Sequence, residues 1–191
     1  MTSKLVLDAL ERAGLDTVLA RRARGEVPHD DAIVELLATA DILALGAAAD
    51  IARRRECSPE ARIFVPFAPP ANAIVTVLGE REAASGTALL RGIAILRLTG
   101  PIGQSIVLDF GVLGLEIAQV GLSFGATDLA GPIGSRRGLP VVADEQKKVV
   151  KRREIAGYVE RAGFQPVFVT SATAISEGEP TASASRDHAQ S

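Results

Sequence analysis

The sequence predicts an α/β protein in which an N-terminal helical layer precedes a partial (β/α) barrel-like or small open sheet of about five strands. Residues 1–60 carry helical signals, whereas residues 61–170 alternate short β-branched runs with helical ones. A closed eight-stranded barrel takes roughly 200 residues or more. The helical layer leaves too few of the 191 residues of this chain for such a barrel. Residues 171–191 are small and polar, which predicts a disordered tail.

Capping residues predict the helices of the N-terminal layer. Ser3, Asp41 and either Asp30 or Asp31 are good N-cap residues, because a short side-chain oxygen accepts a hydrogen bond from a free helical N–H. Small residues over 46–48 allow close helix packing in the last of these helices. The helices are predicted over residues 3–13, 15–24, from 30 or 31 onward, and 42–56.

The α/β core is predicted from β-branched runs and helical periodicity. Residues 125–134 are punctuated by glycine and indicate a strand that leads into a loop, and residues 135–142 indicate a further loop. The strands are predicted over residues 62–67, 73–78, 105–110 and 165–170, and the helices over residues 87–98, 112–124 and 144–162.

Composition excludes several function classes. The net charge is -2, from 21 basic and 23 acidic residues, and gives no electrostatic footprint for nucleic acid. The single cysteine, Cys57, excludes an internal disulfide framework and a site held by several thiolates of this chain. No apolar run reaches the length of about 18 residues that spans a bilayer. We therefore expect a cytoplasmic protein that contacts no membrane and holds no metal or cofactor.

Two carboxylates are candidate ligand-binding groups. Asp109 and Asp128 each lie within or just after an apolar segment, near the expected C-terminal end of a strand. Ligands bind at that edge in α/β folds, where a carboxylate can accept a ribose hydroxyl or act as a base. The alternative is a cap for the following turn. Arg97 lies on an apolar helix, and Asp109 or Asp128 is a conceivable buried partner for it.

Glycine-rich segments offer further candidates. In residues 131–138, Gly131 leaves room for a ligand, and Arg136 and Arg137 supply positive charge for a carboxylate or phosphate. A plain surface loop is the alternative. Residues 111–114 favour a tight turn over an anion loop. The triple arginine before Cys57 is expected to lower its thiol pKa, although a structural thiol is favoured.

Separated stretches resemble the futalosine-pathway radical SAM enzymes of menaquinone biosynthesis, aminofutalosine synthase and dehypoxanthine futalosine cyclase. Residues 41–53 with 62–65 are similar to their N-terminal region. Residues 90–98, the run SFGATDLAG at 123–131, and IAGYVERAGFQP at 155–166 are similar to the last third of their barrel and its C-terminal helix. The resemblance implies that Arg97, Gly125, Asp128 and Gly131 are site positions.

The chain departs from this family at the iron–sulfur centre. The resemblance implies a CxxxCxxC loop that holds a [4Fe–4S] cluster, and this loop is missing here. We therefore expect a truncated relative that is not a radical enzyme by itself.

Three hypotheses remain open. The first is a non-catalytic protein of the futalosine pathway that associates with a full-length radical SAM enzyme or binds a nucleoside. The second is a self-associating structural or interaction protein without a small-molecule site. The third is a small enzyme that uses Asp109 or Asp128 as acid or base.

Overall fold

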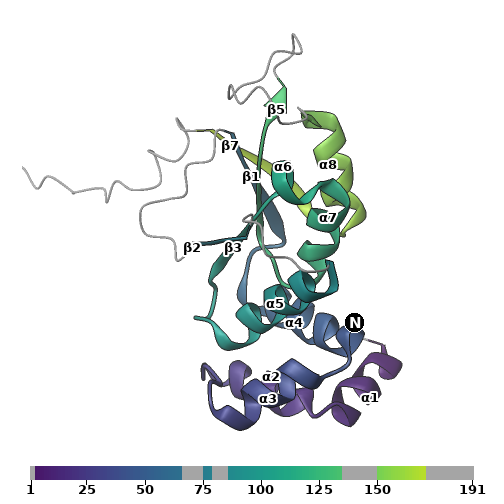
Figure 1. The fold of residues 1–191 in the computed structure, drawn as a ribbon, viewed down its shortest axis with the longest axis vertical. Helices are drawn as coiled ribbons and strands as arrows, with labels where there is room; N and C mark the ends of the chain where they lie inside the picture. Colours follow the sequence, from purple (N-terminus) through teal and green to yellow (C-terminus); the bar gives the residue numbers. More distant parts are fainter. Residues whose placement is uncertain (1–2, 66–74, 79–85, 135–149, 171–191) are drawn as a thin grey trace, which may run out of the picture.

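A computed structural model describes residues 3–65, 75–78, 86–134 and 150–170 of the chain (Figure 1). The predicted capping residues begin the helices of the N-terminal layer. The side chains of Ser3, Asp30 and Asp41 accept hydrogen bonds from the N–H groups of Val6, Ile33 and Ala44, respectively. The helices are α1 (Lys4–Arg12), α2 (Leu15–Ala23), α3 (Asp31–Thr39) and α4 (Ile42–Glu56).

The core of the protein is an open parallel sheet with strand order β2-β3-β4-β1-β7. Its strands are β1 (Glu60–Val65), β2 (Val75–Leu78), β3 (Ser105–Asp109), β4 (Asp128–Ala130) and β7 (Gln165–Thr170). A separate short parallel pair joins β5 (Ile133–Gly134) to β6 (Val150–Lys151). The prediction of a helical layer followed by a small open sheet is confirmed, and the described strands form no closed barrel.

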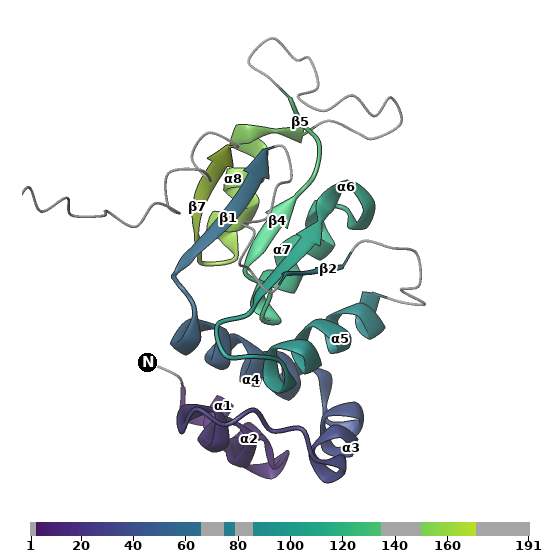
Figure 2. The same cartoon turned by 90° about the vertical axis from the view of Figure 1, so that its left-hand side faces the viewer.

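Helices cover one face of the sheet. They are α5 (Gly86–Thr99), α6 (Phe110–Leu113), α7 (Leu115–Ser123) and α8 (Arg152–Arg161). Ile63, Leu108 and Leu129 share one face because they are neighbours in register, and they pack in one buried cluster with Ile93 of α5 and Ile155 of α8. The N-terminal helices lie beyond the amino ends of the strands (Figure 2).

α5 links the sheet to the N-terminal layer. Its Ile93 belongs to the core beneath the sheet, whereas Ala94 and Leu98 belong to a second core with α1, α2, α3 and α4. Arg22 of α2 donates to the carbonyls of Leu98 and Gly100 at the end of α5.

A second arginine connects α5 and the N-terminal layer, with α5 now as the donor. Arg91 of α5 donates to the carbonyls of Leu37 and Ala40 at the end of α3. Each arginine thus satisfies helix-end carbonyls that lack an intrahelical partner.

Small residues in α4 allow the close packing that the sequence predicts. A Cβ atom on Gly46 would lie 2.7 Å from the ring of Phe124. The absence of a side chain at Gly46 therefore lets this ring lie directly against the α4 backbone.

Two helix predictions are corrected. The single helix predicted over 112–124 is two helices, because the chain turns at Gly114 with a φ of +83°. The helix predicted over 144–162 begins only at Arg152. Val150 is extended because its N–H donates to the carbonyl of Pro132 at 3.1 Å in the β5–β6 pair. Residues 144–149, the predicted loop at 135–142 and the predicted tail lie outside the described residues.

Candidate functional site

The predicted site residues lie at opposite edges of the sheet. Asp109 is the last residue of β3 and Gly131 follows β4, so both lie at the carboxyl edge. Asp128 is the first residue of β4, and Gly125 precedes it. The expectation that Asp128 ends a strand is therefore wrong. Arg136 and Arg137 lie outside the described residues.

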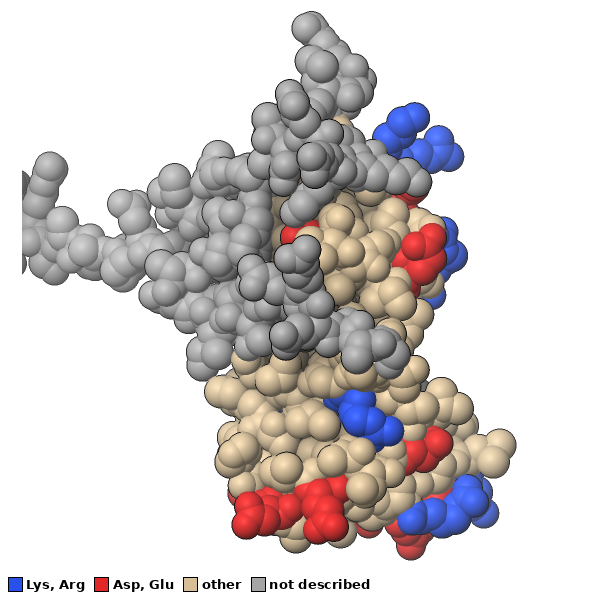
Figure 3. All heavy atoms as spheres, viewed as in Figure 1, with Lys and Arg blue, Asp and Glu red and all other residues tan. Residues whose placement is uncertain are grey.

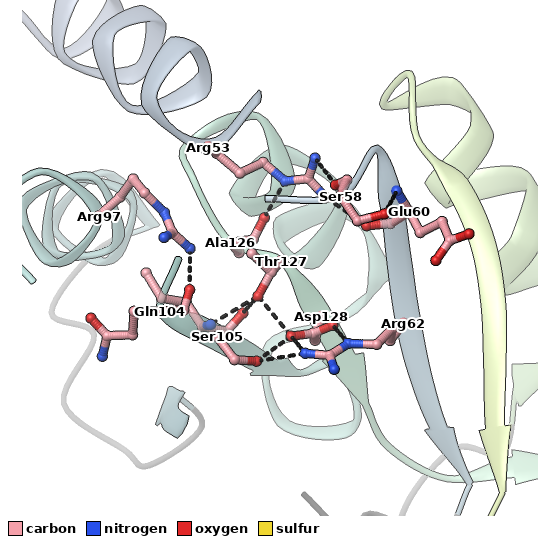
Figure 4. A network of polar contacts seen from close by, with 11 residues as sticks. Arg53, Ser58, Glu60, Arg62, Arg97, Gln104, Ser105, Ala126, Thr127 and Asp128 are labelled. Carbon is pink, nitrogen blue, oxygen red and sulfur yellow. Dashed lines mark hydrogen bonds and ion pairs between the residues drawn. The ribbon is translucent and has the colours of Figure 1, made fainter. Parts of the chain in front are cut away.

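Asp128 is the centre of a polar network at the amino edge (Figure 4). Arg62 of β1 donates to its two carboxylate oxygens at 2.7 and 3.0 Å. Ser105 Oγ donates to Oδ2, and Thr127 Oγ1 donates to the same oxygen at 2.7 Å. The carboxylate is 1% exposed, so its lone pairs are used inside the protein.

This saturation decides what Asp128 can do chemically. A carboxylate that already accepts from a guanidinium and two hydroxyls has little hydrogen-bonding capacity left for a ligand. The network stabilises the sheet, because Arg62 and Asp128 are direct neighbours in the β1–β4 register. A ligand role for Asp128 stays a prediction. The sequence analysis missed Arg62, Ser105 and Thr127. Their signal was a set of polar residues within apolar strand segments.

Two further arginines are buried at the same edge. Arg53 of α4 is 0% exposed and donates to the carbonyls of Ala126, Ser58 and Glu60 at 3.1, 3.2 and 2.9 Å. Its guanidinium lies 3.7 Å from the ring centroid of Phe164. Burial lowers the pKa of Arg53 to about 10, which leaves it protonated at neutral pH.

Arg97 makes a different contact from the one that the sequence predicts. It donates to the carbonyls of Gly125 and Gln104 at 2.9 and 2.7 Å, and no ion pair joins it to Asp109 or Asp128. Burial lowers its pKa as well. A Cβ atom on Gly125, where φ is +105°, would lie 2.8 Å from Arg97 Cβ. Gly125 therefore has a packing role at this edge.

Cys57 follows α4 next to these arginines, and the expectation of a lowered thiol pKa is wrong. Burial raises the pKa of Cys57, and this effect exceeds the opposing influence of Arg97 and Arg53. The thiol is thus less ionised at neutral pH than a free cysteine.

The carboxyl edge is built from turns. Asp109 is half-buried, and its Oδ1 accepts from the N–H of Gly111 at 2.8 Å. It therefore caps the short helix α6, as the alternative prediction held. A Cβ atom on Gly131, where φ is +153°, would lie 2.7 Å from the ring of Phe110. The space beside Gly131 is occupied by this ring, and a ligand role for Asp109 and Gly131 stays a prediction.

Two general features concern the described part of the chain. No group of three His, Cys, Asp or Glu residues there is placed to hold a metal ion. No helix in these segments is both long and apolar enough to cross a bilayer. On the face drawn in Figure 3, acidic and basic side chains are both present and neither sign dominates, in keeping with the net charge of -2.

Comparison with known proteins points to one enzyme. The chain is 31% identical over 106 residues to the aminodeoxyfutalosine synthase of Thermus thermophilus. The match covers 54% of this chain and 28% of that enzyme, so the chain spans little more than a quarter of the length of this relative. The match supports a distant relationship to that enzyme's family. No protein-family model matches the chain, and no solved structure matches it.

Proposed function

We propose that this chain is a non-catalytic relative of aminodeoxyfutalosine synthase. In this proposal the chain itself binds a nucleoside or a full-length radical SAM enzyme in the futalosine pathway of menaquinone biosynthesis. The observation that carries the proposal is the 106-residue match to that synthase. The run SFGATDLAG at 123–131, which resembles this family, includes all of β4 at the centre of the sheet.

The cysteine content supports the non-catalytic part of the proposal. The resemblance implies a [4Fe–4S] cluster held by three thiolates, and this chain has one cysteine. Cys57 follows α4 and precedes the first strand. One cysteine cannot supply the three thiolates that such a cluster needs.

The carboxyl edge of the sheet is the place for a nucleoside. Strand ends at this edge form ligand crevices in open α/β sheets. Asp109 is half-buried there, and a carboxylate is the usual acceptor for ribose hydroxyls.

Iron analysis tests the non-catalytic assignment. After anaerobic reconstitution with iron and sulfide, the purified chain should hold well under one cluster per monomer. A stoichiometric [4Fe–4S] spectrum would overturn the assignment.

Binding measurements test the rest. A thermal-shift series with adenosine and S-adenosylmethionine should stabilise the wild type, and Asp109→Asn should abolish the shift while the exposed control Asp8→Asn keeps it. Co-purification with a full-length radical SAM enzyme would support the accessory role instead. Failure of both measurements would remove the pathway proposal.

Self-association is the second candidate, and exposed apolar residues favour it. Leu43 at the start of α4 is 75% exposed, and Val112 of α6 and Val120 of α7 are 49% and 42% exposed. Such residues are normal when they are scattered singly and indicate an interface when they are contiguous. Light scattering at high protein concentration tests self-association, because a strict monomer would eliminate this candidate.

A further inference from the structure

The exposed face of α8 carries a cluster of basic side chains. In residues 147–153, five of the seven positions are Lys or Arg and none is acidic. Lys151, Arg152 and Arg153 lie in the described part of this run, at the start of α8, and all three are exposed. Figure 3 shows basic atoms gathered where α8 begins in Figure 1. Positive charge at the amino end of a helix raises the free energy of the fold, and a bound anion would offset this effect.

A hollow of about 430 Å³ lies on the outer side of α8. Its lining residues are Lys151, Arg153, Glu154, Gly157, Tyr158 and Arg161. Arg153, Gly157 and Arg161 are spaced by four residues and therefore share one side of the helix. Gly157 contributes no side chain, which leaves the space between the two arginines open. The volume lies in the range of small-molecule sites, roughly 300–1,000 Å³.

Arg161 is held in place over this hollow. The central carbon of its guanidinium lies 4.3 Å from the centroid of the Tyr158 ring, and its Nη1 lies 3.4 Å from the position of a Cβ atom on Gly157. The Tyr158 hydroxyl donates to Glu116 of α7 at 3.2 Å, which fixes the ring. A guanidinium that stacks on a ring keeps its in-plane N–H donors available. Arg161 forms no hydrogen bond or ion pair with the described residues, so these donors are available to a ligand.

The charge of the lining favours an anion. Lys151, Arg153 and Arg161 supply three positive charges, and their side chains form no ion pair with any residue that the structure describes. Glu154 is the one carboxylate among the lining residues, so positive charges exceed negative ones by two. Glu116 lies outside the lining and already accepts a hydrogen bond from Tyr158.

We propose that this hollow binds a small phosphorylated molecule with at least two negative charges, of the pyrophosphate class. The planar forks of Arg153 and Arg161 match phosphate oxygens, to which each can donate in pairs. Lys151 adds a point charge. Glu154 repels any anion, and only an anion that pairs with several of the cations at once overcomes this repulsion.

Calorimetric titration of the full chain with sodium pyrophosphate at constant ionic strength tests this inference. We expect saturable 1:1 binding at millimolar concentration or below. Sulfate should bind more weakly and acetate should not bind, because pairing with several cations requires several negative charges. Equal binding of acetate and pyrophosphate would overturn the inference, and so would a failure of pyrophosphate to saturate the protein.

Substitutions in the lining make the test specific. Arg153→Gln and Arg161→Gln should each weaken pyrophosphate binding about fivefold, as expected for one partly exposed ion pair. Arg161→Lys keeps the charge but loses the fork, so it should recover only part of the affinity. Glu154→Gln removes the repulsion and should strengthen binding about twofold.

Arg12→Gln is the matched control, because it makes the same change of charge at an exposed position of α1, outside this lining. Its affinity for pyrophosphate should equal that of the wild type. Equal weakening in Arg12→Gln and Arg153→Gln would show that the anion responds to net charge alone and would overturn the site. Unchanged urea midpoints exclude a folding defect as the cause of weaker binding.

The outcomes separate this inference from the proposed function. Asp109→Asn should leave pyrophosphate binding unchanged, because Asp109 does not line the hollow on α8. Arg153→Gln should leave the thermal shift with adenosine unchanged for the corresponding reason. Either proposal can therefore fail alone.

Discussion

The two edges of the sheet are built on different principles. At the amino edge, Arg53 of α4 joins the helical layer to the sheet through backbone carbonyls, and Arg62 joins β1 to β4 through Asp128. Arg97 of α5 donates to carbonyls that precede β3 and β4. At the carboxyl edge, Asp109 caps a four-residue helix and stays half-buried. In α/β proteins the carboxyl ends of strands serve ligands and the opposite ends serve stability. Buried charge alone is therefore a poor guide to a binding site here.

The largest effect is expected at Arg53. Arg53→Ala leaves the buried carbonyl of Ala126 and the part-buried carbonyls of Ser58 and Glu60 without this donor. It also removes the contact with Phe164, so it should lower the free energy of unfolding by about 4 kcal/mol. Urea unfolding followed by circular dichroism measures this. Arg54→Ala is the matched control, since its pair with Asp50 is half-exposed and contributes about 0.5 kcal/mol. Equal losses in both variants would contradict the contrast.

The two aspartates should differ next. Asp128→Asn removes the charge that pairs with Arg62 at a site 1% exposed and should cost about 3 kcal/mol. Asp109→Asn should cost under about 1 kcal/mol, because asparagine is itself a good helix cap. The same unfolding experiment compares them. A greater loss of unfolding free energy in Asp109→Asn than in Asp128→Asn would contradict the structural role of Asp128.

Glycine substitutions test how closely the backbone packs against Arg97. Gly125→Ala forces a positive φ on alanine and brings its Cβ against Arg97, so we expect a loss of about 2 kcal/mol. Gly25→Ala is the control, since Gly25 has a φ of +83° but no atom within 4 Å of the added Cβ. It should cost about 1 kcal/mol from backbone strain alone. Equal melting temperatures for the two variants would show that contact with Arg97 is unimportant.

The smallest effect concerns the rate of a chemical reaction. Because burial raises the pKa of Cys57, the reactive thiolate should be scarcer at neutral pH than in a free cysteine. The rate of labelling by a disulfide reagent should therefore rise with pH over a range above that of a model thiol. A midpoint below that of the model thiol would show that the arginines outweigh burial.

Local signals made much of this fold predictable. Ser3, Asp30 and Asp41 act within four residues of their own position, so their capping role is visible in the sequence. The strand at β3 and the helix α4 follow from short-range pattern and composition in the same way. The short strand β6 was missed because its extended backbone depends on the carbonyl of Pro132, which is remote in sequence.

The polar network at the amino edge was only partly predictable. Asp128 was identified as unusual because it is a carboxylate in an apolar segment, but its edge and partners were not. Its pairing with Arg62 spans 66 residues and depends on β1 lying next to β4 rather than next to β2. That strand order is a tertiary property, and no local pattern in β1 specifies it.

The reciprocal arginine contacts of α5 bear on how the protein melts. Arg22 of the helical layer donates to a carbonyl at the end of α5, and Arg91 of α5 donates to a carbonyl at the end of α3. Detaching the layer would strip carbonyl partners from both helix ends and uncover Ala94 and Leu98 at once. Layer and sheet should consequently lose their structure in one calorimetric step, with no separately melting N-terminal fragment.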